Sequence, residues 1–271
     1  MTDAQGRGEI RALLARHDHR PNKMLGQHFL ADPNLVSRIV RTAGVGAGEN
    51  VVEVGAGTGT LTRALAATGA RVVAYEIDRH LEPVLSEALR DTDVDLRFTD
   101  VTALDLAAEL GPGPWTMVAN LPYNIGTRLV LDTLRTVPAV VRFVVMVQRE
   151  VAERMVAGPG SRVYGLPSVV VGLRASARIE FGVSREVFYP HPDVDSAVVV
   201  LERREPAPEV VRAEALAGAA FGQRRKMLRR SLRGFLADTD ATLRRAEIDP
   251  GARPESLAPE AFVRIAAAED T

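Results

Sequence analysis

Short runs of apolar and β-branched residues alternate with stretches of helical periodicity from Glu49 to about Arg204. Such runs are typical of buried parallel strands, and the helical stretches between them supply right-handed crossovers. We predict six of these strands, and a seventh that is close enough in sequence to the sixth to pair with it in antiparallel fashion. Their ranges are Asn50 to Gly55, Ala70 to Glu76, Val94 to Thr99, Trp115 to Asn120, Arg142 to Gln148, Ser168 to Ile179 and Ala197 to Glu202. The predicted fold class is α/β, with a seven-stranded sheet whose last strand is antiparallel.

The chain changes character after this sheet. Residues 205–209 hold two prolines between acidic residues, which suit a linker better than the interior of a strand or helix. Beyond them Ala, Arg, Glu and Leu recur with helical periodicity, which predicts a small all-helical domain. We therefore expect a basic N-terminal segment over residues 1–48, the sheet domain over residues 49–204 and the helical domain over residues 205–271.

Composition narrows the class of protein. A chain of 271 residues that is 46% hydrophobic can bury a substantial core. It has no cysteine, which excludes disulfides and cysteine metal sites and suits a reducing compartment. We find no signal-peptide pattern and no apolar stretch long enough to span a bilayer. We expect a cytoplasmic, monomeric protein with no metal and no membrane contact.

The first predicted strand leads into a glycine-rich turn and then into the helical stretch Thr60 to Ala67. Glycines allow a tight turn and let a ligand approach the backbone closely. A dinucleotide fingerprint requires Gly-x-Gly-x-x-Gly, whereas the spacing here is Gly-x-Gly-x-Gly preceded by Glu53. This pattern resembles motif I of S-adenosylmethionine (SAM) methyltransferases, with Gly55, Gly57 and Gly59 as its glycines.

Two acidic residues follow the next two predicted strands. Glu76 is placed where a carboxylate can accept the ribose hydroxyls of a nucleoside cofactor, and Asp100 where one can accept from its adenine amino group. Each alone is also compatible with a helix cap or a solvated side chain. Together they fit the rule that open α/β sheets bind ligands at the carboxyl ends of their strands.

Asn120-Leu121-Pro122-Tyr123 directly follows the apolar run Trp115 to Ala119. The Asn120 side-chain oxygen and the Leu121 carbonyl can each accept an N–H of an adenine amino group, and Pro122 restricts the backbone between them and Tyr123. Tyr123 can stack on the base, a contact worth about 1–3 kcal/mol. An ordinary strand-to-loop turn is the alternative interpretation. With the glycine turn upstream, the tetrapeptide indicates methylation of an adenine base.

The net charge of −1 gives no sign of a nucleic acid partner, but the cations are clustered. One cluster runs from Arg11 to Lys23. The other spans residues 223–233, where helical spacing turns Met227, Leu228 and Leu232 inward. A solvated helix face is the alternative for this second cluster. Its density of positive charge without an acid favours contact with phosphates. The candidate RNA-binding residues are Arg224, Arg225, Lys226, Arg229 and Arg230.

These motifs occur together, in order, with several further segments. They are Leu25-Gly26-Gln27-His28-Phe29-Leu30, Gln148-Arg149-Glu150-Val151-Ala152, the segment 187–199 with its Phe-Tyr-Pro-His-Pro core, and Phe221-Gly222-Gln223-Arg224-Arg225-Lys226. Over nearly its whole length the chain resembles the KsgA-type small-subunit ribosomal RNA adenine N6,N6-dimethyltransferases. The resemblance implies a Rossmann-like class I SAM-dependent methyltransferase sheet with a C-terminal helical domain.

The resemblance also implies residue roles. Gln27, His28 and Leu30 would border the SAM pocket together with Gly55, Glu76, Asp100 and Asn120. The N-terminal segment would act as a flap over the methionine end. His28 would contribute a backbone contact. Phe188 would face Tyr123 across the target base, although from sequence alone it could equally belong to the core.

The implied substrate is a pair of adjacent adenosines in the 3′-terminal hairpin loop of small-subunit (16S) ribosomal RNA, each methylated twice in the assembling small subunit. A macrolide-resistance type methylase of large-subunit RNA is one alternative. An assembly factor with vestigial catalysis is the other.

Overall fold

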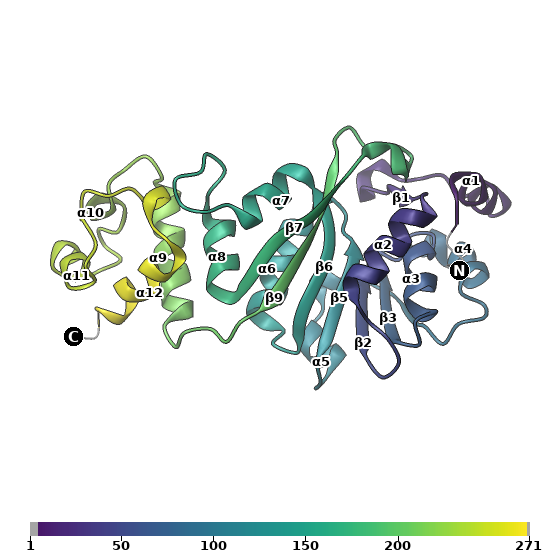
Figure 1. The fold of residues 1–271 in the computed structure, drawn as a ribbon, viewed down its shortest axis with the longest axis horizontal. Helices are drawn as coiled ribbons and strands as arrows, with labels where there is room; N and C mark the ends of the chain where they lie inside the picture. Colours follow the sequence, from purple (N-terminus) through teal and green to yellow (C-terminus); the bar gives the residue numbers. More distant parts are fainter. Residues whose placement is uncertain (1–4, 270–271) are drawn as a thin grey trace. The chain divides into compact units, whose positions relative to one another are not determined.

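The computed structural model describes residues 5–269 and divides the chain into two compact units (Figure 1). The first unit, called here the sheet unit, comprises the residues up to 152 together with residues 178–202. The second, the helical unit, comprises residues 153–177 and the residues from 203 onward. Positions 1–4 and 270–271 of the expected terminal domains lie outside the described residues.

The main sheet has seven strands in the order β4-β3-β2-β5-β6-β9-β7. The pairs β4–β3, β3–β2, β2–β5 and β5–β6 are parallel, whereas β9 is antiparallel to β6. The predicted seven strands with an antiparallel last strand are therefore confirmed. Their bounds are Asn50–Val54 (β2), Arg71–Glu76 (β3), Asp95–Phe98 (β4), Trp115–Asn120 (β5), Val140–Gln148 (β6), Ala175–Val183 (β7) and Ser196–Arg203 (β9).

The strand order reverses at β2, because β3 lies on one side of it and β5 on the other. The crossovers on the two sides of such a point diverge and leave a crevice at the carboxyl ends of the two central strands. Here those ends are Val54, which precedes the glycine turn, and Asn120, which opens the tetrapeptide. The topology thus brings the two sequence motifs to one edge of the sheet.

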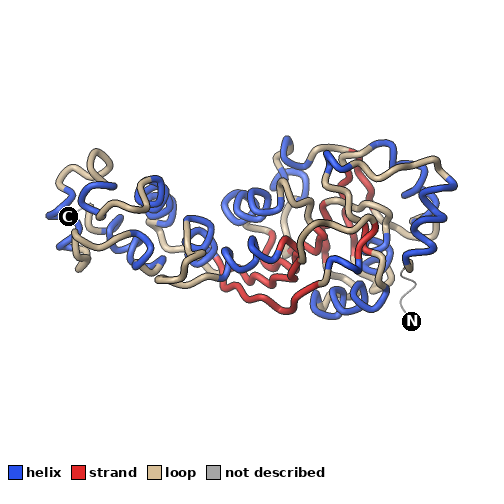
Figure 2. Tube along the Cα trace, turned by 90° about the horizontal axis from the view of Figure 1, so that it is seen from above, coloured by secondary structure: helices blue, strands red, loops and turns tan. Residues whose placement is uncertain are grey.

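Helices cover both faces of this sheet (Figure 2). On one face Val51, Val72 and Val144 join a hydrophobic cluster with residues of α2, α3 and α4. The alternate residues Val52 and Val73 are equally buried, as a sheet covered on both sides requires. The helices of this unit are α1 (Arg7–Arg16), α2 (Pro33–Ala43), α3 (Thr60–Ala66), α4 (Glu82–Ala88), α5 (Leu106–Leu110) and α6 (Gly126–Thr136), and α7 (Arg149–Val156) begins in it.

A second, two-stranded sheet joins the N-terminal segment to the segment before β9. Strand β1 (Phe29–Leu30) pairs antiparallel with β8 (Phe188–Tyr189), so that Leu30 lies opposite Phe188. Two of the segments that carried the family resemblance are therefore neighbours in space.

The helical unit has its own core, centred on Tyr164, Leu216 and Phe262. The Tyr164 hydroxyl donates to the carbonyl of Leu257 at 2.7 Å, and burial raises the pKa of this phenol. The unit contains α8 (Leu166–Arg174), α9 (Val210–Gly222), α10 (Leu228–Ser231), α11 (Thr239–Arg245) and α12 (Pro259–Ala267).

The extent of one predicted strand needs correction. The strand predicted over Ser168 to Ile179 begins only at Ala175, because its first half is helix α8 with Pro167 in the first turn. Proline is well tolerated there, and Val169 and Leu173 of α8 pack in the helical core instead of a sheet. Residues 153–177 group with the residues from 203 onward in the helical unit, whereas the sequence predicts a helical domain over residues 205–271.

Candidate active site

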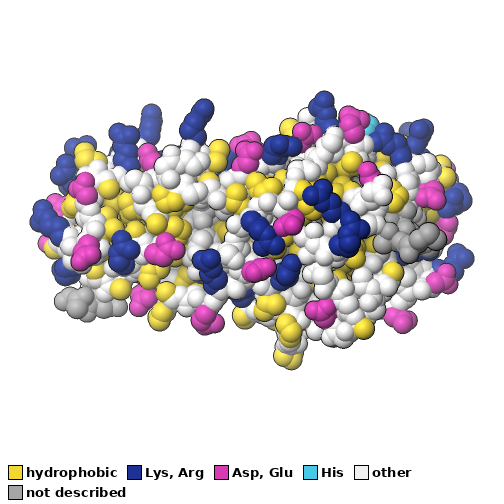
Figure 3. Space-filling model, viewed as in Figure 1, with side chains coloured by type: hydrophobic (Ala, Val, Ile, Leu, Met, Phe, Trp, Pro, Cys, Tyr) yellow, Lys and Arg dark blue, Asp and Glu magenta, His cyan; other side chains and the backbone are white. Residues whose placement is uncertain are grey.

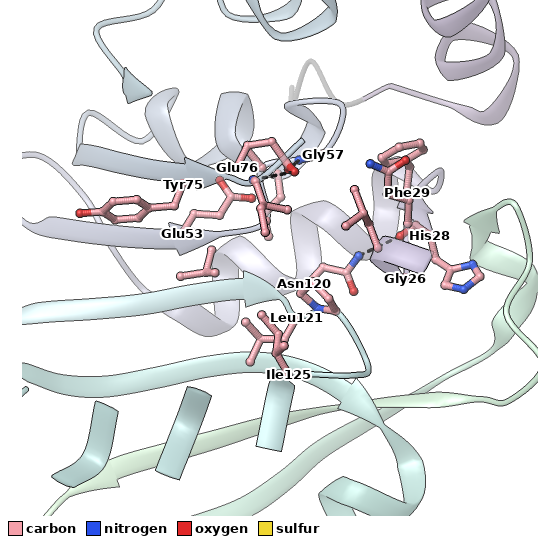
Figure 4. A pocket seen from close by; sticks show the side chains of 18 of the residues that line it. Gly26, His28, Phe29, Glu53, Gly57, Tyr75, Glu76, Asn120, Leu121 and Ile125 are labelled. Carbon is pink, nitrogen blue, oxygen red and sulfur yellow. Dashed lines mark hydrogen bonds between the residues drawn. The ribbon is translucent and has the colours of Figure 1, made fainter. Parts of the chain in front are cut away.

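The crevice at the ends of β2 and β5 contains a cavity with about 890 Å³ of empty space that opens to solvent (Figure 4). Its walls come from the glycine turn, the ends of β3 and β4, the tetrapeptide after β5, and residues 25–30. We call residues 21–30 the flap segment.

The glycine turn has a backbone that only glycine adopts without strain. The φ angles of Gly55, Gly57 and Gly59 are +84°, +58° and +76°. A Cβ atom on Gly57 would lie 3.0 Å from the ring of Phe29. The flap segment therefore lies directly against the turn, a contact that the motif alone did not reveal.

Glu76 lies at the end of β3 and lines the cavity (Figure 4). Its Oε2 accepts from the backbone N–H of Gly57 at 2.8 Å, and its Oε1 accepts from those of Ile77 and Asp78 at 2.9 Å. A carboxylate has about four acceptor positions, so roughly one remains for a ligand. Burial raises the pKa of Glu76, although the backbone hydrogen bonds favour the charged form.

Glu53, which precedes the glycine turn, is fully buried and also lines the cavity. Burial raises the pKa of its carboxyl to about 8, and the nearby charge of Glu76 adds to that effect. Its Oε2 makes no hydrogen bond to any described residue. Burial therefore favours the protonated form of Glu53.

Asp100 follows β4, lines the cavity and is exposed. Its Oδ1 accepts from the backbone N–H of Thr102 at 2.9 Å and from the Thr102 hydroxyl at 2.7 Å. Asp100 thus caps the short helical turn Val101–Ala103 and at the same time borders the cavity. The helix cap that the sequence offered as an alternative is present, and the position at the cavity keeps Asp100 a candidate cofactor-binding residue.

Asn120 and Tyr123 line the same cavity from the end of β5. Asn120 Nδ2 donates to the backbone carbonyl of His28 at 3.0 Å, which leaves its Oδ1 as the acceptor (Figure 4). The Tyr123 hydroxyl lies 2.7 Å from Ser196 Oγ, and its ring stacks on His28 with centroids 5.6 Å apart. Burial raises the pKa of Tyr123, so its phenol is neutral at physiological pH.

Leu121 and Pro122 complete the tetrapeptide and also line the cavity. The backbone N–H of Leu121 donates to the carbonyl of Met146 at 3.1 Å, which continues the pairing of β5 with β6. Pro122 lies against the glycine turn, since a Cβ on Gly55 would be 3.5 Å from Pro122 Cδ. The two motifs are in direct contact.

The flap segment places Gln27, His28 and Leu30 along the cavity. His28 Nδ1 donates to the carbonyl of Pro190 at 2.9 Å, so its ring is anchored outside the cavity. The side chains of Gln27 and Leu30 are buried. The sequence missed Gly26, Phe29 and Ile77 as lining residues, because nothing in their local pattern separates them from ordinary loop or core positions.

Phe188 lies elsewhere than predicted. Its side chain is 0% exposed, belongs to the core of the sheet unit, and is not part of the cavity wall. The pairing of β8 with β1 sets this position, since it holds Phe188 opposite Leu30. A ring without exposed surface cannot stack on a base in this structure.

The predicted RNA-binding cations are all exposed on the helical unit, whose surface carries many Lys and Arg side chains (Figure 3). Leu228 and Leu232 are buried as predicted, but only Leu228–Ser231 is helical. Arg224 donates to the carbonyl of Arg162 at 3.1 Å. Arg225, Lys226 and Arg230 form no ion pair with any described residue, which leaves them available to anions.

Within residues 5–269, no helix is both long and apolar enough to cross a membrane. No group of three or more His, Asp or Glu side chains in that range could hold a metal ion.

The fold and the cavity define a class of protein. A mostly parallel sheet with an antiparallel strand β9, a glycine turn after β2 and acidic residues after β3 and β4 are the features of a Rossmann-like class I methyltransferase. The chain belongs to the ribosomal RNA adenine dimethylase family, whose model matches residues 18–269.

Individual relatives agree with this assignment. Ribosomal RNA small subunit methyltransferase A of Leifsonia xyli subsp. xyli is 46% identical, covering 97% of each chain. The protein of the same name from Streptomyces avermitilis is 44% identical, covering 96% of this chain and 92% of that one.

Among solved structures, the 23S rRNA methyltransferase ErmE is 28% identical, with a TM-score of 0.69 over 90% of this chain and all of that one. A dimethyladenosine transferase from Plasmodium falciparum has a TM-score of 0.75 over 88% of this chain and 96% of its own, at 22% identity, and shows the shared fold.

Proposed function

We propose that this protein transfers methyl groups from SAM to the N6 amino groups of two adjacent adenosines in the 3′-terminal hairpin loop of 16S ribosomal RNA, forming dimethyladenosines. The observation that carries the proposal is the meeting of the two motifs in one cavity, with Pro122 against Gly55 and Asn120 beside the flap segment. The 46% identity to a small-subunit methyltransferase over nearly the whole chain supports the choice of substrate.

The residues present fit SAM. The glycine turn presents a backbone free of side chains, Glu76 keeps acceptor capacity toward the cavity, and Asp100 borders it. We infer that Gly55, Gly57, Gly59, Glu76 and Asp100 hold the nucleoside part of SAM. Gln27, His28, Leu30 and Asn120 border the pocket, and the flap segment covers the methionine end. SAM supplies an electrophilic methyl group when bound.

The protein's contribution to the transfer is alignment. Asn120 Oδ1 and the Leu121 carbonyl accept the two N–H groups of the adenine amine, which orients its lone pair. Tyr123 stacks on the base with the ring face that His28 does not cover, and Ser196 fixes the phenol. The reaction needs no general base, because the amine becomes acidic after transfer and loses a proton to water.

Loop adenosines are suitable substrates, because flipping an unpaired base into a pocket costs only a few kcal/mol. We propose that Arg224, Arg225, Lys226, Arg229 and Arg230 bind backbone phosphates of the RNA. Since the substrate is part of the assembling small subunit, we place the activity in the cytoplasm. We also expect the protein to act as a monomer.

The decisive experiment uses small subunits from cells that lack the modification. Incubation with the protein and labelled SAM should yield N6,N6-dimethyladenosine in 16S RNA, identified by mass spectrometry of nucleosides. Large subunits serve as the parallel substrate. Label confined to large-subunit RNA would overturn the proposal in favour of a resistance-type methylase, which a drug-resistance assay would then detect.

A further inference from the structure

The side-chain amide of Gln27 makes hydrogen bonds at both ends. Its Nε2 donates to Asp78 Oδ2 at 2.7 Å, and its Oε1 accepts from the backbone N–H of Asn22 at 2.7 Å. His19 Nε2 lies 3.4 Å from the same oxygen. The side chain is only 9% exposed. The side-chain acceptor of Gln27 is therefore committed to the N-terminal segment and one of its donors to Asp78, while the residue lies along the cavity wall.

Asp78 is joined in turn to the end of β3. Its backbone N–H donates to Glu76 Oε1 at 2.9 Å, and its Oδ1 accepts from the backbone N–H of His80 at 3.0 Å. Burial acts to raise the pKa of Asp78, but the hydrogen bonds from Gln27 and His80 hold it below its ordinary value. Asp78 is therefore a charged acceptor, and hydrogen bonds to charged acceptors are the stronger kind.

The segment that Gln27 anchors forms cavity wall on both sides of it. Leu25 and Gly26 precede it, and His28 and Phe29 follow it. The His28 carbonyl receives the hydrogen bond from Asn120, and the Phe29 ring lies against Gly57. A shift of Gln27 would therefore disturb both the cofactor side and the base side of the cavity.

We propose that Gln27 is a positioning residue, whose hydrogen bond to Asp78 holds the flap segment against the glycine turn and thereby sets the affinity for SAM. This inference rests on the proposed SAM-dependent function. A purely structural role for Gln27 would lower the stability of the whole protein and leave SAM affinity of the folded protein unchanged.

A double-mutant cycle tests the proposal, with SAM binding to the full chain measured by calorimetry. Gln27→Ala and Asp78→Ala should each weaken SAM binding about tenfold or more. The double variant should be no weaker than the weaker single variant, because both changes remove the same contact. Asp93→Ala, an exposed acid outside this cavity, is the matched control and should bind normally.

Exchanging the amide and the carboxylate between positions 27 and 78 should rescue SAM binding. Gln27→Glu sets two carboxylates against each other and should weaken SAM binding, whereas Gln27→Glu with Asp78→Asn restores one donor and one acceptor and should recover most of the affinity. If the alanine variants fail to fold, this conservative pair carries the test. Hydrogen exchange of residues 25–29 should be faster in Gln27→Ala than in the wild type.

Additive effects in the cycle, or unchanged SAM affinity and exchange in folded variants, would overturn the proposal. A wild-type protein that does not bind SAM would instead overturn the proposed function, so the two failures are distinguishable.

Discussion

The two halves of the cavity are built in different ways. The half at β2 and β3 is made mostly of backbone: three glycines with positive φ and a carboxylate that accepts backbone N–H groups. The half at β5 depends on side chains that residues far away in the sequence hold in place. Asn120 is fixed by His28, and Tyr123 by His28 and Ser196. The first half is therefore determined by the backbone preferences of neighbouring residues, whereas the second depends on contacts between residues that are distant in the sequence.

The largest expected effect comes from replacing Asn120, which belongs to the half of the cavity at β5. Asn120→Ala removes one of the two acceptors for the adenine amine, so we expect kcat to fall by about 10²–10³-fold. SAM affinity should fall by a smaller factor than kcat, because the glycine turn and Glu76 are intact and only the hydrogen bond from Asn120 to the His28 carbonyl is lost on the cofactor side. Single-turnover methylation and calorimetry check this prediction; an equal loss of SAM affinity would show that the two halves are not separate.

Glu53 belongs to the half of the cavity at β2 and β3, and its carboxyl should make the stability of the protein depend on pH. Its folded-state pKa of about 8 exceeds the ordinary value of 4.5, so its stabilising contribution is present below pH 4.5 and is lost as pH rises toward 8. Glu53→Gln removes this dependence. As pH rises from 4.5 to 8, the difference in unfolding free energy between the variant and the wild type should therefore shift by roughly 4 kcal/mol in favour of the variant.

Denaturant unfolding at a series of pH values, without SAM, measures this difference. A difference between variant and wild type that stays constant with pH would mean that Glu53 is ionised in the folded protein.

Glu76 belongs to the same half of the cavity, and replacing it should weaken SAM binding. Glu76→Ala removes a charged acceptor at the end of β3, so SAM affinity should fall by about 10–100-fold. RNA binding should be retained, because the proposed phosphate contacts lie on the helical unit. Parallel measurement of both affinities checks this, and joint loss would contradict separate binding surfaces.

The smallest expected effect concerns the exposed cations of the helical unit, which do not line the cavity. Replacing Arg225, Lys226 and Arg230 with Ala should weaken RNA binding and make it less dependent on salt, since each phosphate contact adds roughly 0.7–0.9 to the slope of log K against log salt. SAM affinity should be unchanged. An unaltered slope would show that these cations do not touch phosphates.

Local sequence predicted the parts of the fold that obey local rules. Strands β2, β3 and β5 were predicted from β-branched and apolar runs, and the glycine turn from its spacing. The same reasoning failed at Val169 to Val171, because strand propensity is weaker than the packing of α8 on the helical core.

The sequence by itself determined strands β2, β3 and β5, the glycine turn with its neighbouring carboxylates, and the tetrapeptide, because each depends on a few consecutive residues and their backbone preferences. Only the tertiary structure decided that Phe188 belongs to the core, that His28 orders Asn120 and Tyr123, and that Gln27 is bonded to Asp78. Those outcomes depend on which distant segments pack together. Packing reflects burial and hydrogen bonding across the whole fold, and no local pattern records it.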